Sequence, residues 1–136
     1  MIYDIAIIGG GPGGYVAAIR AAKLGKRIIL VESNELGGIC LNWGCIPTKS
    51  LLKNAEILEF IQNSSKFGID IDNYTINWNK IIKRSRDISK RLSKGIQYLM
   101  KKNKIEVISG KGAILNNTTI EVVTNGKKIT LNTKNI

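Results

Sequence analysis

Five glycines near the start of the chain restrict its fold more than any other feature. They lie in the segment Gly9-Gly10-Gly11-Pro12-Gly13-Gly14. An apolar, β-branched run at residues 2–8 precedes this segment, a helical pattern at 15–24 follows it, and a second apolar run comes at 27–31. Two apolar strands joined by a helix predict a right-handed βαβ unit with parallel strands. The sequence therefore indicates an α/β fold.

The spacing Gly9-x-Gly11-x-x-Gly14 between a strand and a helix matches the dinucleotide fingerprint of a Rossmann-like domain. The first glycine permits a tight turn, the second lets a pyrophosphate approach the backbone, and the third lets the helix pack closely. Glu32 ends the second strand, where its carboxylate can accept hydrogen bonds from ribose hydroxyls. A glycine-rich turn in an unrelated α/β protein is the alternative.

The rest of the chain predicts two further helices and three further strands. The helices are expected at about 47–62 and 77–103, with a polar connection at 63–68. The strands are expected at 105–108, 119–124 and 128–133, and Asn125-Gly126 predicts a hairpin between the last two. We expect a partial parallel sheet of three strands and a small antiparallel β-meander.

The chain carries a formal net charge of +11, much of it between Lys80 and Lys104. The apolar residues of that segment are predicted to share one helical face: Ile81, Ile88, Leu92, Ile96 and Leu99. Its basic residues fall largely on the other faces, which favours a solvated surface over a phosphate-binding stripe. No nucleic-acid motif is present, so we expect no nucleic-acid partner.

Composition excludes several other classes of protein. The chain has no histidine, which removes the commonest general base and the commonest metal ligand. No apolar run approaches the roughly 20 residues that span a bilayer. An acidic residue, Asp4, follows Met1 closely, which argues against a secretory signal. We therefore expect a cytoplasmic protein with no membrane association and no metal site.

Both cysteines of the chain, Cys40 and Cys45, lie in the segment GGICLNWGCIPTKS. They could be buried apolar thiols, a stabilising disulfide or metal ligands. A disulfide across so short a loop removes little chain entropy, and the expected compartment is reducing. A metal site lacks further ligands. The remaining interpretation is a redox disulfide at the start of a helix, where the helix dipole lowers the pKa of a thiol.

These motifs resemble the amino-terminal part of the flavoprotein disulfide reductases. The resemblance runs over the whole chain and rests on the glycine segment, Glu32, LGGICLNWGCIPTKSLL at residues 36–52 and Gly110-x-Gly112. Leu41-Asn42 and Gly44-Cys45-Ile46-Pro47 are similar to the dihydrolipoamide dehydrogenase branch of that family.

The resemblance implies an FAD site. The pyrophosphate would lie on Gly9, Gly11, Pro12, Gly13 and Gly14, and Glu32 would bind the adenosine ribose. Further cofactor contacts are implied for Ser33, Gly37, Gly38, Gly112 and Ala113. Ser33 replaces a basic residue and Ile39 replaces a threonine found in many relatives.

The resemblance also implies catalytic roles. Cys40 would exchange disulfides with the substrate, Cys45 would be the charge-transfer thiolate against the flavin, and Lys49 would lie near the flavin. All three would therefore contact the cofactor as well. Dihydrolipoamide would reduce the disulfide, and its electrons would pass through FAD to NAD⁺.

By the same resemblance, residues 1–136 are the amino-terminal part of an FAD-binding domain with the redox-disulfide helix. The NAD-binding and dimerisation domains would belong to a longer parent, so we expect the fragment to be inactive alone. The parent is expected to be a homodimer that reoxidises dihydrolipoamide on the acyltransferase component of 2-oxoacid dehydrogenase complexes. The alternatives are a glutathione- or mercuric-reductase-like flavoenzyme and a non-catalytic nucleotide-binding module.

Overall fold

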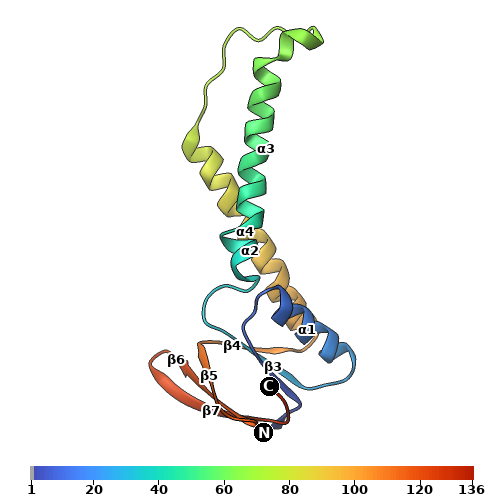
Figure 1. The fold of residues 1–136 in the computed structure, drawn as a ribbon, viewed down its shortest axis with the longest axis vertical. Helices are drawn as coiled ribbons and strands as arrows, with labels where there is room; N and C mark the ends of the chain where they lie inside the picture. Colours follow the sequence, from blue (N-terminus) through green and yellow to red (C-terminus); the bar gives the residue numbers. More distant parts are fainter. Residues whose placement is uncertain (1) are drawn as a thin grey trace.

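The computed structural model describes residues 2–136 as two sheets with four helices, from which a long helical hairpin projects (Figure 1). Its elements are β1 (Ile2–Tyr3), β2 (Ile5–Ile8), α1 (Pro12–Lys23), β3 (Ile28–Glu32), α2 (Gly38–Asn42), α3 (Cys45–Gln62), a 3₁₀ turn (Ser64–Phe67), α4 (Trp78–Lys102), β4 (Glu106–Ser109), β5 (Lys111–Asn116), β6 (Thr119–Thr124) and β7 (Lys127–Thr133).

The first sheet is parallel, with strand order β2-β3-β4. Its central strand is buried on both faces because side chains alternate along a strand. Ile28 and Leu30 pack with Ala18 of α1 and with residues of α4, whereas Ile29 and Val31 pack against the second sheet. The predicted Rossmann-like α/β fold with a three-stranded parallel sheet is confirmed.

The second sheet has the order β1-β7-β6-β5, in which β5, β6 and β7 form an antiparallel meander. Asn125 and Gly126 both adopt positive φ at the hairpin between β6 and β7, as predicted. The strand β5 was not predicted from the sequence.

The run at residues 2–8 was predicted as one strand, and this is wrong in one respect. The run divides at Asp4, because β1 pairs with β7 whereas β2 pairs with β3. At this break between β1 and β2, the Asp4 N–H donates to the carbonyl of Arg27 (2.9 Å), and the Arg27 N–H donates to Asp4 Oδ2 (2.8 Å). One short segment therefore serves both sheets.

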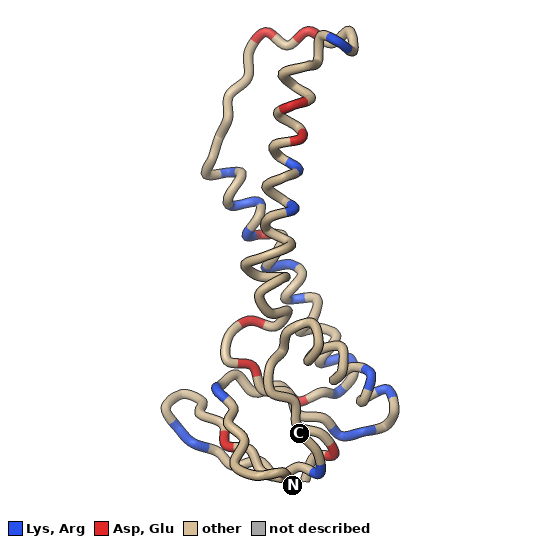
Figure 2. The backbone as a smooth tube through the Cα atoms, viewed as in Figure 1, with Lys and Arg blue, Asp and Glu red and all other residues tan. Residues whose placement is uncertain are grey.

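The helices α3 and α4 form an antiparallel hairpin that extends away from the sheets (Figure 1). Lysine and arginine residues lie along the whole of α4 (Figure 2). The part of α4 nearer the sheets, lower in Figure 1, also packs against α1 and α2. This helix therefore connects the hairpin to the Rossmann-like core.

The buried face of α4 differs from the predicted apolar face. Of the predicted positions Ile96 is buried and Ile81 and Ile88 are half-buried, whereas Leu92 and Leu99 remain 40% and 38% exposed. The buried residues are instead Ser85, Ser89, Ser93, Ile96 and Met100. Small side chains allow helices to approach closely, so a stripe of serines occupies the contact and displaces the leucines toward solvent. Among the described residues 2–136, no helix is long and apolar enough to span a membrane.

Candidate functional site

The glycine segment joins the end of β2 to the start of α1, which begins at Pro12. Gly9 has a φ of 104°, a conformation that favours glycine, and its N–H donates to the carbonyl of Val31 (2.7 Å). A Cβ added to Gly14 would lie 1.8 Å from the carbonyl oxygen of Gly9. Strand and helix therefore meet at a distance that only glycine permits, with the helix N-terminus at the carboxyl end of the sheet.

The carboxylate of Glu32 lies beside this segment at the end of β3. Its Oε2 accepts a hydrogen bond from the Gly10 N–H (2.6 Å), and its Oε1 accepts one from the Asn34 N–H (2.8 Å). Ser33 Oγ is 3.5 Å from Oε1, so this serine supports the carboxylate at most weakly. A carboxylate has about four lone-pair sites, so Glu32 keeps the capacity to accept further hydrogen bonds.

A second pair of glycines brings the cysteine-bearing segment against the first. The Gly37 N–H donates to the carbonyl of Gly10 (2.8 Å). A Cβ added to Gly38 would lie 2.9 Å from the Cα of Gly11. The start of α2 is therefore in contact with the glycine segment, with no room for a side chain at Gly38.

The strand β5 contributes Gly112 to the same edge of the parallel sheet. A Cβ at Gly112 would lie 3.3 Å from the side chain of Ile8 and 3.4 Å from that of Val31. Ala113 follows it in the strand and is exposed. A cavity of about 510 Å³ opens next to Glu32, between α4 and the strands β3 and β4. The glycine segment, Glu32, Gly37, Gly38 and Gly112 thus lie together at the carboxyl edge of the parallel sheet, which is where α/β proteins bind nucleotides.

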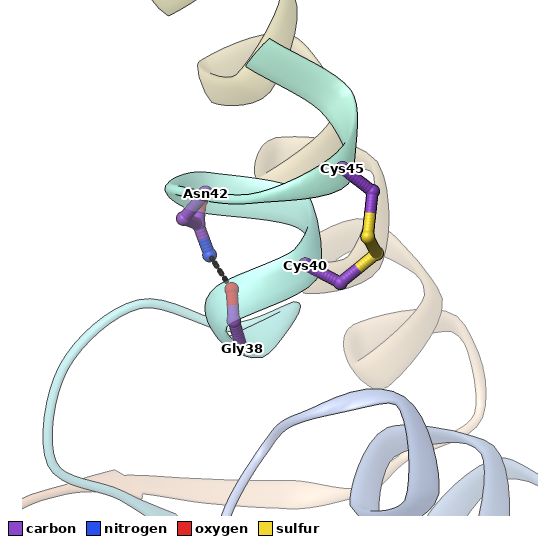
Figure 3. The surroundings of a disulfide bond; sticks show 4 residues. All are labelled: Gly38, Cys40, Asn42 and Cys45. Carbon is purple, nitrogen blue, oxygen red and sulfur yellow. Dashed lines mark hydrogen bonds between the residues drawn. A yellow bond between two sulfur atoms is a disulfide. The ribbon is translucent and has the colours of Figure 1, made fainter. Parts of the chain in front are cut away.

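The two cysteines form a disulfide that joins α2 to α3 (Figure 3). Cys40 lies within α2 and is half-buried, whereas Cys45 is the first residue of α3 and is exposed. Their Cα atoms are 4.7 Å apart. Lys49 is exposed on α3 one turn after Cys45, on the same side of the helix.

Asn42 fixes the segment that carries the disulfide, residues 37–45 (the disulfide segment), a role that the sequence analysis missed. Its side-chain amide is buried and donates to the carbonyls of Leu36 (3.1 Å) and Gly38 (3.0 Å; Figure 3). Arg86 of α4 donates to the carbonyl of Asn42 (2.9 Å). The available sequence signal was one amide side chain in the otherwise apolar run 39–43, because such a side chain, if buried, needs hydrogen-bond partners.

Two arginines of α4 are exposed, as expected, but also make hydrogen bonds to the site. Arg86 contacts the disulfide segment, and Arg84 donates to the hydroxyl of Ser50 on α3 (2.9 Å). These hydrogen bonds connect α4 to both helices that carry the cysteines. Part of the basic face therefore orders the site.

The arrangement fits a dinucleotide cofactor. The first N–H groups of α1 have no partner within the helix and carry the positive end of its dipole, which suits a pyrophosphate. Gly11 and Gly38 leave the backbone uncovered by side chains, and Glu32 offers acceptors for a ribose. A disulfide attached to the same segment through Gly38 can exchange electrons with a redox cofactor or with thiols.

Comparisons with known proteins agree with this chemistry. Residues 3–136 match the model of the family described as "Pyridine nucleotide-disulphide oxidoreductase". A dihydrolipoyl dehydrogenase of Zymomonas mobilis is 50% identical over 135 residues, which are 98% of this chain and 29% of that protein. That of Corynebacterium glutamicum is 50% identical over 126 residues, 92% of this chain and 26% of that protein. That of Acholeplasma laidlawii is 46% identical over 135 residues, 98% of this chain and 39% of that protein. The chain thus spans well under half the length of these relatives.

Proposed function

Because the chain belongs to the pyridine nucleotide-disulphide oxidoreductase family, we propose that it is the FAD- and disulfide-bearing part of a dihydrolipoyl dehydrogenase. The observation that carries this proposal is the Cys40–Cys45 disulfide at the start of α3, attached through Gly38 to a glycine segment of the dinucleotide-binding type.

FAD would be held by residues from four segments of the chain. The N-terminus of α1, with the segment Gly9–Gly14, would bind the pyrophosphate, and Glu32 the adenosine ribose. The backbone at Gly37–Gly38 and at Gly112–Ala113 would approach the cofactor closely. The bound flavin would supply two-electron chemistry, taking electrons from the cysteine pair and delivering a hydride to NAD⁺.

The residues of this chain would carry out the thiol–disulfide exchange. One thiolate of dihydrolipoamide attacks Sγ of Cys40, the Cys40–Cys45 bond breaks, and Cys45 leaves as a thiolate. The second substrate thiolate attacks the substrate sulfur of the mixed disulfide and releases Cys40. The substrate is thereby oxidised to a disulfide by two electrons, the cysteine pair is reduced by two, and two protons leave the substrate thiols.

The position of each cysteine supports this assignment of roles. Cys45 is the first residue of the 18-residue helix α3, whose N-terminal dipole stabilises a thiolate. The better leaving thiolate departs faster, so attack at Cys40 is favoured. Lys49, one turn further along α3, places a cation on the same side of the helix, where it would contact the flavin.

The partners of the whole enzyme are part of the same proposal. We infer that the substrate is dihydrolipoamide on the acyltransferase component of a 2-oxoacid dehydrogenase complex. We also infer that the enzyme is a homodimer in which further domains bind NAD⁺. These inferences rest on relatives named dihydrolipoyl dehydrogenase, of which this chain spans 29% in the example from Zymomonas mobilis.

The test uses the protein in its native length, purified with FAD. We expect NADH formation from dihydrolipoamide and NAD⁺, and its loss in Cys40→Ser, because serine cannot form the mixed disulfide. A matched control is Ser65→Ala, an exposed position in the 3₁₀ turn far along the chain from both cysteines.

Other results would identify a different function. Normal turnover in Cys40→Ser would exclude the proposed exchange. Preference for NADPH with a glutathione-like disulfide, or reduction of mercuric ion, would place the protein in another branch of the family. Failure of the native protein to bind flavin would favour a non-catalytic nucleotide-binding module.

A further inference from the structure

A second groove lies between the disulfide segment and α4. It encloses about 310 Å³, which is near the lower end of the range typical of small-molecule sites, roughly 300–1,000 Å³. The side chains that matter for its chemistry are Glu35, Trp43, Arg86, Ser89, Lys90 and Lys94. Arg86 also donates to the carbonyl of Asn42, whereas the other five have no role in the proposed FAD site or in the thiol–disulfide exchange.

Three cations line this groove at regular helical spacing. Arg86, Lys90 and Lys94 occupy successive turns of α4, so they project from the same side of the helix. One carboxylate, that of Glu35, also lines the groove, and its Oε2 is 3.4 Å from Ser93 Oγ. The formal charge of the lining is therefore +2, which favours an anion.

A buried hydroxyl in the wall of the groove provides an independent indication of a ligand. Ser89 is only 4% exposed, and its Oγ has no hydrogen-bond partner among residues 2–136. The serines one turn to either side differ, since Ser85 donates to the carbonyl of Ile82 (2.8 Å) and Ser93 contacts Glu35. An unpartnered buried hydroxyl is destabilising. The Oγ has no accessible surface in this conformation, and rotation about the Cα–Cβ bond to another staggered position would bring it to a ligand in the groove that accepts its hydrogen bond.

The remaining wall is aromatic. Trp43 lies between the two cysteines and is 52% exposed, so a large part of its ring is accessible beside the cations. Basic side chains, a hydroxyl donor and an aromatic face together suit a phosphate group that bears a small organic substituent.

We propose that the groove lined by Arg86, Ser89, Lys90, Lys94 and Trp43 binds a phosphate-bearing small molecule, with free phosphate or a phosphate monoester as its source. The phosphate oxygens would accept hydrogen bonds from Ser89 Oγ and from the lysine ammonium groups. An organic substituent would lie on the ring of Trp43. The site is separate from the FAD site and would be occupied together with it.

The test is calorimetric titration of the native-length protein, saturated with FAD, at constant ionic strength set with chloride. Inorganic phosphate and phenyl phosphate are the probes. We expect saturable binding of one phosphate per chain, because a specific site persists when general charge screening is held fixed. Heats that do not exceed those of a chloride titration would overturn the proposal.

Charge variants on adjacent residues locate the site. Lys90→Gln should weaken phosphate binding about tenfold, the equivalent of about 1.4 kcal/mol for one lost charged contact. The control is Arg91→Gln, which removes the same charge from an exposed neighbour that does not line the groove. This control should change the affinity less than twofold. Equal losses in the two variants would indicate a diffuse electrostatic effect and overturn the proposal.

Removal of the Ser89 hydroxyl should change stability and phosphate affinity in opposite directions. Ser89→Ala should raise the thermal midpoint without ligand, because it removes an unsatisfied buried group, and should weaken phosphate binding about fivefold, as expected for one hydrogen bond. Unchanged affinity in this variant would overturn the proposal. Tighter binding of phenyl phosphate, lost in Trp43→Ala, would identify a monoester as the ligand, and equal affinity of both probes would identify free phosphate.

Discussion

The N–H of Gly10 donates a 2.6 Å hydrogen bond to Oε2 of Glu32, and this contact joins the turn after β2 to the end of β3. The two residues are 22 positions apart in the chain. A hydrogen bond to a charged acceptor is stronger than one between neutral groups. The acidic residue at the end of the second strand therefore fixes the conformation of the glycine segment as well as offering acceptors to a ribose.

Replacement of Glu32 should weaken FAD binding for both of these reasons. We expect Glu32→Ala to lower the affinity for FAD by about tenfold to hundredfold, the equivalent of roughly 1.5–3 kcal/mol for lost charged hydrogen bonds. The effect is measured as the amount of FAD released during ultrafiltration, from its fluorescence in the filtrate. Glu59→Ala, on the exposed side of α3, is the control for loss of one negative charge. Equal retention of FAD by the two variants would contradict the role of Glu32.

A substitution at Gly14 should disrupt the contact between α1 and β2. Gly14→Ala places a methyl group 1.8 Å from the carbonyl oxygen of Gly9, so the helix must move away from the strand. We expect a loss of at least about 1–3 kcal/mol in the free energy of unfolding, measured in urea, as for other overpacked sites.

The neighbouring glycine offers a matched control for Gly14. A Cβ at Gly13 meets no atom within 4 Å. Gly13→Ala should therefore leave the protein equally stable or stabilise it by about 0.5–1 kcal/mol, because alanine loses less backbone entropy than glycine in a helix. Similar losses of stability in both variants would show that the close approach at Gly14 does not limit packing.

Much of the Rossmann-like core could be predicted because its sequence signals are local. The apolar strands around the glycine segment predicted β2, α1 and β3, and Asn125-Gly126 predicted the β6–β7 hairpin. The break at Asp4 could not be predicted in this way. It depends on pairing with Arg27 and with the distant strand β7, and neither partner is visible in a local pattern.

The predicted face of α4 was only partly correct, because hydrophobicity does not report how closely two helices approach. The serines at 85, 89 and 93 repeat every fourth residue, but their small polar side chains do not contribute to an apolar period. A charge pattern correctly assigns Arg84 and Arg86 to the exposed surface, but it does not reveal the hydrogen bonds that both donate to the cysteine-bearing helices. Only the packing of α4 against α2 and α3 distinguishes them from the lysines nearby.

Loss of the Asn42 amide should loosen the segment that carries Cys40. Asn42→Ala removes hydrogen bonds to the carbonyls of Leu36 and Gly38 and leaves both without this donor. We expect a loss of about 1–3 kcal/mol in the free energy of unfolding, together with faster reduction of the disulfide by an external thiol. Urea unfolding and timed thiol trapping measure the two effects. The control is Asn63→Ala, whose amide donates to the carbonyl of Glu59 and accepts from Lys66, both far along the chain from Cys40, and it should change neither quantity appreciably.

The hydrogen bond between Tyr3 and Glu106 should make the stability of the protein depend on pH in the alkaline range. The Tyr3 hydroxyl donates to Glu106 Oε2 (2.6 Å). Burial, followed by the hydrogen bond and the negative charge of Glu106, raises the pKa of Tyr3 from 10.0 to about 12. A pKa raised in the folded state means that the stabilisation is fully present below pH 10. It is then lost as the pH rises through about 12, because the unfolded chain loses the phenol proton first.

Tyr3→Phe isolates this contribution, because it removes the titrating hydroxyl but keeps the ring in its buried position. At neutral pH we expect the variant to be less stable than the native protein by about 1 kcal/mol, the net contribution of one hydrogen bond. The difference between the two free energies of unfolding should shrink steadily above pH 10, since the native protein alone loses this stabilisation. Tyr98→Phe, at an exposed position on α4, provides the control. A difference between Tyr3→Phe and the native protein that stays constant from neutral pH to pH 12 would show that the Tyr3 hydroxyl is not coupled to folding.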